Sequence, residues 1–356
     1  MKYVIARLLL LFVIVVSSLL LVDTLYRQQY NLEYPSMGPL WKHPPIVEPY
    51  EIVKVGNSHA DDGITFEFYN LRGLELAGVA QRFRFDRVLL QQYENQIADD
   101  AIILIDVSHI SFSHRKADQS DGMQGNYYGR VSPFLIPDLK VSDYLQTTVA
   151  PFIRSGYAWR KAYSDEVRER IAAEEKWIDP LEATASSEPK EIPFKETKEY
   201  FTYVDSIEYE LAHPRKIPRA SYVDNMNFIF NKWYHTEEFD PQYFAYNRRE
   251  LEKLIAYCLR QNWRPVLITI PVTSILEEGL LDDYKQIYLY DNLAQTDTQG
   301  VEYIDFTTRT DFTDNMTFFS NADHLNERGR IVFSYLLLQE LVERGYVGPE
   351  VDGYRQ

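Results

Sequence analysis

Apolar and polar positions along the first part of the chain follow a pattern that predicts strands and helices in turn. Two short apolar blocks, Glu51–Val55 and Ala101–Val107, read as strands, and the second is apolar at nearly every position. A strand of that kind is typical of the centre of a parallel sheet covered on both faces. We also predict a short strand at Phe66–Tyr69 and a helix from about Leu74 to Tyr93.

The same alternation returns after residue 245. The pattern predicts, in order, a helix at about Arg248–Gln261, a strand at Pro265–Ile270, a helix near Asp283–Leu293, a strand at Val301–Phe306 and a closing helix with Asn326 as its N-cap. This rhythm predicts an α/β domain with a doubly wound, mostly parallel sheet. The domain spans residues 51–350 and is interrupted by a long central insertion at about 111–244.

The beginning of the chain differs from the rest. An apolar run from Leu8 to Val22 follows Lys2 and Arg7, and it approaches the ~20 residues of a spanning helix. We expect an uncleaved transmembrane signal anchor at residues 1–25. A cleavable signal peptide is the alternative, but the run ends without a small-x-small cleavage pattern. The basic residues before the run predict a single-pass protein with a cytoplasmic N-terminus and an extracytoplasmic domain. Residues 26–50, rich in Pro and Tyr, then form a tether.

Composition narrows the function classes. The chain has 356 residues, with 53 acidic and 37 basic side chains, for a net charge of -16. That charge repels phosphate backbones, so we expect no nucleic-acid partner. The histidines show no spacing typical of metal ligands, so we predict neither a metal nor another cofactor. The single cysteine, Cys258, fits the apolar face of a helix and is predicted to be a core residue.

Candidate chemistry lies where the first strand ends and where the last helix begins. Ser58 follows the first strand in Gly56-Asn57-Ser58-His59, and ligands bind beyond the carboxyl ends of strands in open α/β sheets. A serine hydroxyl needs a base, and His324 lies in the polar cluster before the closing helix. Asp323 is the nearest carboxylate that could orient the imidazole, although adjacent side chains often diverge. His59, next to Ser58, could assist the site, but packing or capping at the first turn of the following helix is the favoured role.

These blocks carry a family resemblance. The Gly56–His59 turn, the Asn70–Gly73 block and the Asp323–Asn326 block resemble the SGNH (GDSL-like) hydrolase superfamily. The most similar branch is membrane-anchored and includes the D-alanyl transfer protein of teichoic acid synthesis and exopolysaccharide O-acetylation proteins. The resemblance covers about residues 51–110 and 245–345. It implies Ser58 as nucleophile, His324 as base, and Gly73 and Asn70 as oxyanion-hole donors. The Ser58 backbone N–H is a further candidate donor.

Two positions depart from the superfamily pattern. Asn321 stands three residues before the histidine, where the superfamily usually has aspartate, and Asp323 stands immediately before it. Ser108-His109-Ile110-Ser111 replaces the usual Gly-x-Asn-Asp block. Asn321 and His109 are therefore supporting candidates, and for His109 a place at the sheet edge is an equal alternative.

The leading interpretation is an extracytoplasmic, membrane-anchored serine esterase or O-acyltransferase that acts on acyl esters of cell-surface or exported polysaccharide. Its expected partners are an acylated glycan or acyl-donor substrate, the membrane through the anchor, and an integral membrane acyltransferase. The alternative is a noncatalytic glycan-binding or scaffolding subunit of a membrane O-acylation complex. Asn321, at the usual aspartate position, is the main support for this alternative.

Overall fold

A computed structural model describes residues 48–66, 71–78, 81–113, 198–217, 241–279 and 284–348, with a short helix at 10–18 and single positions elsewhere. Contacts divide the chain into two compact units, residues 1–36 with 119–179, and residues 37–118 with 180–356. The sheet and the candidate site both lie in the second unit.

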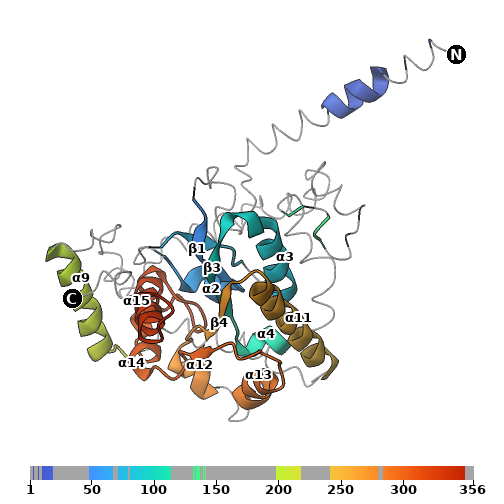
Figure 1. The fold of residues 1–356 in the computed structure, drawn as a ribbon. Helices are drawn as coiled ribbons and strands as arrows, with labels where there is room; N and C mark the ends of the chain where they lie inside the picture. The colour runs from blue at the N-terminus through green and yellow to red at the C-terminus, as the bar shows by residue number, and fades with distance from the viewer. Residues whose placement is uncertain are drawn as a thin grey trace, which may run out of the picture. The chain divides into compact units, whose positions relative to one another are not determined.

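A parallel sheet forms the centre of this unit (Figure 1). In the described residues it has five strands: β1 (Tyr50–Val55), β2 (Gly73–Glu75), β3 (Ile97–Asp106), β4 (Arg264–Thr269) and β5 (Tyr303–Asp305). Their order is β2-β1-β3-β4-β5, and every neighbouring pair is parallel. An α/β fold with a parallel sheet is therefore confirmed.

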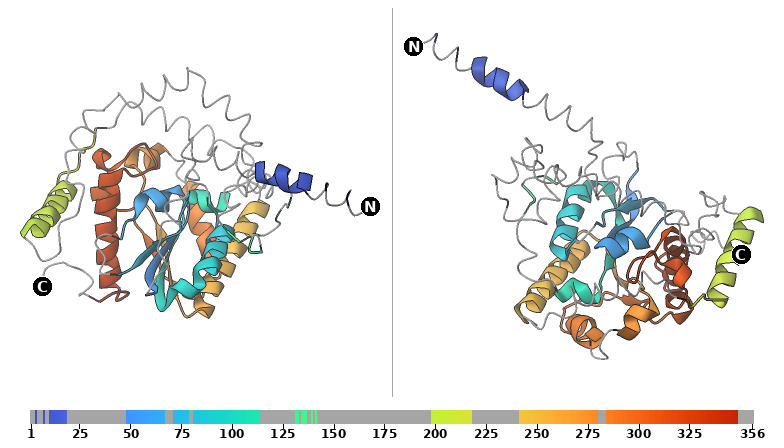
Figure 2. Two further views of the ribbon diagram at one scale, coloured as in Figure 1. Left: turned by 90° about the horizontal axis from the view of Figure 1, so that it is seen from above. Right: turned by 180° about the vertical axis from the view of Figure 1, so that it is seen from behind.

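Helices cover both faces of the sheet (Figure 2). The described helices are α2 (Ser58–Gly63), α3 (Phe83–Tyr93), α4 (His109–Ser113), α9 (Lys198–Ala212), α11 (Pro241–Arg260), α12 (Ser274–Gly279), α13 (Asp291–Ala294), α14 (Thr310–Thr313) and α15 (Glu327–Glu343). A π-helical turn at Gln286–Tyr290 precedes α13. The helices α2 and α15 pack together on one face, and α3 and α11 pack together on the other.

The main core lies between the sheet and α15. Alternate strand residues such as Ile52, Leu104 and Ile268 are fully buried against the apolar side chains of that helix. Helix α9 joins the same core through Val204 and Ile207. Part of the predicted insertion is therefore a helix that completes the hydrophobic core, while most of the insertion lies outside the described residues.

A buried lysine connects the sheet to α2. The Lys54 side chain, on β1, is fully buried, and its Nζ donates to the carbonyls of Ile64 at 2.6 Å and Asp61 at 3.1 Å. The same ammonium lies 3.5 Å from Glu75 on β2. Carbonyls at the end of a helix lack intrahelical partners, so Lys54 supplies donors to the last turn of α2 and fixes that helix on the sheet.

Two predicted elements are wrong. We predicted a helix from Leu74, but Leu74 and Glu75 belong to β2, and the helix α3 begins only at Phe83. We placed the second strand at 66–69, but Phe66 is not in a strand and 67–69 lie outside the described residues. Leu74 and Leu76 are two residues apart and both buried, which fits one face of a strand and not one face of a helix, and Gly73–Glu75 pair with β1.

The other predicted elements of the described part are confirmed with shifted ends. The predicted ranges 51–55, 101–107, 265–270 and 301–306 overlap β1, β3, β4 and β5, and the closing helix is α15. Its N-cap is Asn326, whose side chain accepts from the Gly329 N–H at 2.9 Å. Cys258 is buried in α11 as expected.

The predicted anchor is only partly described. A helix is present at residues 10–18, and the rest of the apolar run and the tether, up to residue 47, lie outside the described residues. Within the described residues, no helix has both the length and the apolar character of a membrane span.

Gly329 is expected to tolerate no side chain. Alanine in place of glycine inside a helix normally stabilises by roughly 0.5–1 kcal/mol. A Cβ at Gly329 would overlap the Phe318 carbonyl oxygen, which is backbone and cannot rotate away. We therefore expect Gly329→Ala to lower the free energy of unfolding by about 2 kcal/mol, measured by urea denaturation. Glu343→Ala, at an exposed position of the same helix, should change it by less than about 0.5 kcal/mol. An unchanged or raised stability of Gly329→Ala would contradict this packing.

Candidate active site

The strand order places Ser58 where a parallel sheet ordinarily binds ligands. The chain moves outward from β1 to β2 and then returns past β1 to β3, so the direction of winding reverses between β1 and β3. Crevices at such reversal points, outside the carboxyl ends of the strands, are the usual ligand sites of open α/β sheets. Ser58 begins the helix α2 directly after β1.

The turn before Ser58 depends on two small or polar residues. Gly56 has φ +141°, and a Cβ there would lie 2.5 Å from the Asp106 Cβ, so the turn requires glycine. Asn57 is the N-cap of α2, and its Oδ1 accepts from the His59 N–H at 2.8 Å. Together with Lys54 at the other end of α2, these contacts hold Ser58 at a fixed height above the sheet.

His324 is held by a tight loop before α15. The Ser320 N–H donates to the His324 carbonyl at 2.9 Å, and Phe319 pairs with Leu325. Inside the loop, Asn321 Oδ1 accepts from the His324 N–H at 2.8 Å. The buried Thr273 hydroxyl donates to the Ala322 carbonyl at 2.8 Å and ties the loop to the segment after β4.

The structure brings Ser58, His324 and Asp323 together. His324 Nε2 lies 2.9 Å from Ser58 Oγ, and His324 Nδ1 lies 2.8 Å from Asp323 Oδ1. Because a carboxylate only accepts, Nδ1 carries the proton and Nε2 is the lone-pair acceptor for the Ser58 hydroxyl. All three side chains are partly exposed, so a substrate can reach the hydroxyl. This arrangement can remove the serine proton and stabilise the resulting imidazolium.

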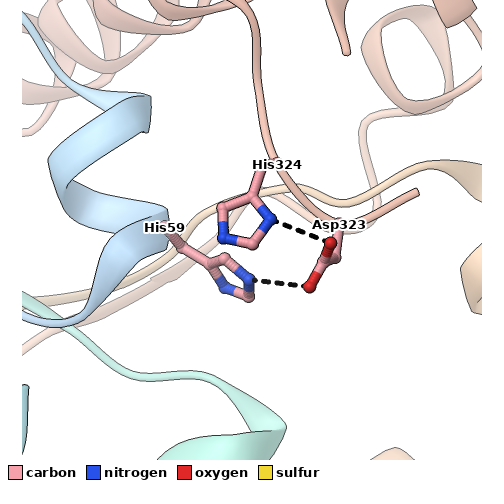
Figure 3. Close-up of side chains that lie close together, drawn as sticks. All are labelled: His59, Asp323 and His324. Carbon is pink, nitrogen blue, oxygen red and sulfur yellow. Dashed lines mark hydrogen bonds and ion pairs between the residues drawn. The ribbon is translucent and has the colours of Figure 1, made fainter. Parts of the chain in front are cut away.

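Asp323 also faces a second histidine (Figure 3). Its Oδ2 lies 3.7 Å from His59 Nε2, and the rings of His59 and His324 meet edge to face with centroids 5.0 Å apart. Burial opposes ionisation of Asp323, but its contacts with His324 and His59 outweigh burial and hold its pKa well below the usual range. Asp323 is therefore a carboxylate throughout the neutral range. Packing or capping is the role that the sequence favours for His59, with assistance to the site as the alternative, and no local pattern indicates the contact with Asp323.

Two buried carboxyls lie beneath the Ser58 turn. Asp106 ends β3, and burial raises its pKa to about 6, against the opposing effects of His59 and the Asn57 backbone. Asp86, on α3, accepts from Gln81 at 2.7 Å, and burial raises its pKa to about 8. They line a small cavity together with Gly56. An aspartate closing an apolar strand was visible in the sequence, but its burial beside the site was not.

The remaining predicted residues are not all at the site. Gly73 starts β2 opposite Ile52, and β2 ends at Glu75 opposite Lys54. Only the chain beyond the strand reaches the level of Gly56, where the Gly78 N–H donates to the Gly56 carbonyl at 3.0 Å. Gly73 therefore lies away from Ser58, and the predicted oxyanion role is wrong, because the strand was placed too early in the sequence. Asn70 lies outside the described residues.

Asn321 and His109 have different places. Asn321 shapes the loop through its contacts to the N–H groups of Asp323 and His324, and its Oδ1 also lies 3.3 Å from His324 Nδ1. His109 begins α4, and its side chain lies outside the described part of the structure.

Among the described residues, a group that could hold a metal ion consists of His59, Asp323 and His324. The sequence spacing did not predict that two histidines would meet here. Both ring nitrogens of His324 already face other atoms of the site, Ser58 Oγ and Asp323 Oδ1. A metal ion bound to this group would have to displace one of these contacts.

Comparisons with known proteins add no assignment. No protein-family model matches the chain, and no curated protein matches it significantly.

The buried Asp86 should make stability fall as pH rises. Its pKa is about 8 in the folded protein and near 4 when unfolded, so between these values the folded state binds one more proton. Because the folded state binds this extra proton, Asp86 contributes to the free energy of unfolding at low pH, and the contribution is lost as pH rises toward 8. We expect the free energy of unfolding to decrease from pH 5 to pH 8, and Asp86→Asn to reduce this slope. The exposed Asp297→Asn variant should keep it. Equal slopes in wild type and Asp86→Asn would contradict the assignment.

Proposed function

We propose that this protein is a serine esterase or O-acyltransferase that uses Ser58 as nucleophile and His324 as general base. The observation that carries the proposal is the hydrogen-bonded series of Ser58, His324 and Asp323, with distances of 2.9 and 2.8 Å. These three residues have the roles and the geometry of a catalytic triad. The site also lies at the carboxyl edge of a parallel sheet, as the resemblance to the SGNH hydrolases implies.

The proposed reaction has two halves. Ser58 Oγ attacks the carbonyl carbon of an acyl ester while its proton passes to His324 Nε2, and the departing alcohol takes that proton as the ester bond breaks. Water or a sugar hydroxyl then gives its proton to His324 Nε2 and attacks the carbonyl carbon of the acyl-serine. As the bond between that carbon and Ser58 Oγ breaks, Oγ takes the proton back from His324, and the acid or the new ester leaves. Asp323 keeps Nδ1 protonated and stabilises the imidazolium in both halves.

One donor for the developing oxyanion is proposed from the position of the nucleophile. The Ser58 N–H is the first of α2, and the first N–H groups of a helix have no intrahelical acceptor. Donors aimed at the developing charge contribute substantially to acyl transfer. Gly73, the other backbone donor predicted from the sequence, lies away from Ser58.

The proposed substrate is an acyl ester of a cell-surface or exported polysaccharide, with the chain anchored in the membrane at its N-terminus. The described helix at 10–18 supports an anchor, because its side chains from Leu10 to Val16 are apolar and 36–65% exposed. A helix that is apolar on all sides and exposed in water requires a lipid or protein environment. An integral membrane acyltransferase remains the proposed partner.

Substitution of the three residues tests the reaction. We expect Ser58→Ala and His324→Ala to lower the turnover of p-nitrophenyl acetate by the full-length chain at least about 10³-fold. Asp323→Asn should lower it about 10²-fold or more, because it no longer holds the Nδ1–H tautomer. Asn321→Asp should keep turnover within about threefold, because a carboxylate still accepts the loop N–H groups.

His213→Ala is the matched control, because His213 is exposed in the same unit, and within the described residues its ring contacts Tyr209 of the preceding helix α9. A serine-directed phosphonate should label the wild type and not Ser58→Ala. A folded wild type that neither turns over the ester nor reacts with the phosphonate would contradict the enzyme proposal and favour the noncatalytic glycan-binding subunit.

The anchor is tested separately. We expect the full-length chain to stay with the membrane pellet during alkaline extraction, and a chain with Leu11, Ile14 and Val15 changed to Asp to move to the supernatant, because charged residues oppose insertion. Release of the wild type by the same treatment would argue against an integral anchor.

A further inference from the structure

The position of Asp323 next to His324 in the chain presents a geometric difficulty. Side chains of neighbouring residues in extended backbone point to opposite sides. Here the Asp323 carboxylate nevertheless turns back to place Oδ1 2.8 Å from His324 Nδ1. The contacts made by Asn321 bend the loop backbone, but they leave the other carboxylate oxygen without support.

That second oxygen faces His59. Its Nε2 lies 3.7 Å from Asp323 Oδ2, and the two histidine rings lie on the same side of the carboxylate in Figure 3. His59 is 4% exposed, and neither of its ring nitrogens has a hydrogen-bond partner within the described residues. A buried imidazole without such a partner is unfavourable unless another interaction stabilises it. The Asp323 carboxylate, 3.7 Å from Nε2, supplies an electrostatic one.

We propose that His59 is a positioning residue of the active site, which holds Asp323 Oδ2 through Nε2 and so keeps Oδ1 on the imidazole of His324. The proposal rests on the proposed function, because His324 must be the base for this positioning to affect turnover. His59 does not touch Ser58 Oγ or the substrate in this role. It acts through Asp323.

The surroundings of His59 favour its charged form. Acidic groups face it from three elements: Asp323 from the loop before α15, Asp106 from β3 and Asp62 from α2. Burial lowers the pKa of His59, but these carboxylates together raise it above its ordinary value. The neighbouring imidazole of His324 is the other titratable ring in contact with it. The Asp323 carboxylate therefore interacts with both rings, with His324 through Oδ1 and with His59 through Oδ2.

Three substitutions separate positioning from simple packing. Glutamine can place its amide nitrogen close to the position of His59 Nε2, whereas asparagine is too short and leucine has no donor. We expect His59→Asn and His59→Leu to lower kcat about 10- to 100-fold with KM changed less than about threefold, because the base is misplaced and substrate binding is not. His59→Gln should recover kcat to within about fivefold of wild type.

A double-mutant cycle tests whether the effect passes through Asp323. In the Asp323→Asn background, His59→Asn should lower kcat by less than about twofold more, because the carboxylate that it positions is already gone. A merely structural role would lower kcat equally in both backgrounds, and that result, or full activity of His59→Asn, would overturn the proposal.

A measurement independent of turnover uses histidine-selective NMR of the full-length chain. We expect the titration of the His59 ring to move to lower pH in Asp323→Asn, because a carboxylate that stabilises the imidazolium has been removed. The signal is assigned by its loss in His59→Gln, and His213→Ala is the control. An unchanged His59 titration would overturn the contact.

The two proposals fail in different ways. Ser58→Ala with wild-type turnover, together with a shifted His59 titration in Asp323→Asn, would overturn the enzyme and leave the contact in place. Loss of turnover in Ser58→Ala, together with an unchanged His59 titration and normal kcat in His59→Asn, would overturn the role of His59 alone.

Discussion

The hydrogen bond between Ser58 and His324 joins residues 266 positions apart, and the rest of the domain can be understood as the support for it. A bond of 2.9 Å tolerates little movement of either loop. One loop is fixed by Lys54, Gly56 and Asn57 at the end of β1, and the other by Asn321 and Thr273 before α15. Packing of α15 on α2 then joins the two supports into one body.

Buried ionisable groups surround this bond on the protein side. His59, Asp106 and Asp86 extend from the site into the domain, and each carries a raised pKa for which burial or neighbouring charge is responsible. Such groups cost stability unless they are paired, and perturbed titration tends to cluster at functional sites. The fold therefore fixes the charged groups around Ser58 and His324 as well as the positions of these two side chains.

Much of this architecture could be predicted from sequence, and the failures have physical causes. Continuous apolar runs identified β1, β3 and β4, and the polar cluster before Asn326 identified the His324 loop. The second strand was misplaced because three residues give too little periodicity to separate strand from helix. That error transferred the oxyanion role to Gly73. The contact of His59 with Asp323 depends on tertiary packing between α2 and a loop far away in the chain, which local patterns do not encode.

The pairing of β3 with β4 has a consequence for how this chain can change over time. The Thr269 hydroxyl donates to the Val107 carbonyl, 162 positions earlier in the chain, so the two ends of this long segment lie at adjacent strands. The entropic cost of closing a flexible loop rises only with the logarithm of its length. Descendants of this gene can therefore lengthen, shorten or exchange residues 119–179, which belong to the other compact unit, and acquire new acceptors or partners. The helices α9 and α11 of the same segment have to stay, because they pack into the domain that holds nucleophile and base.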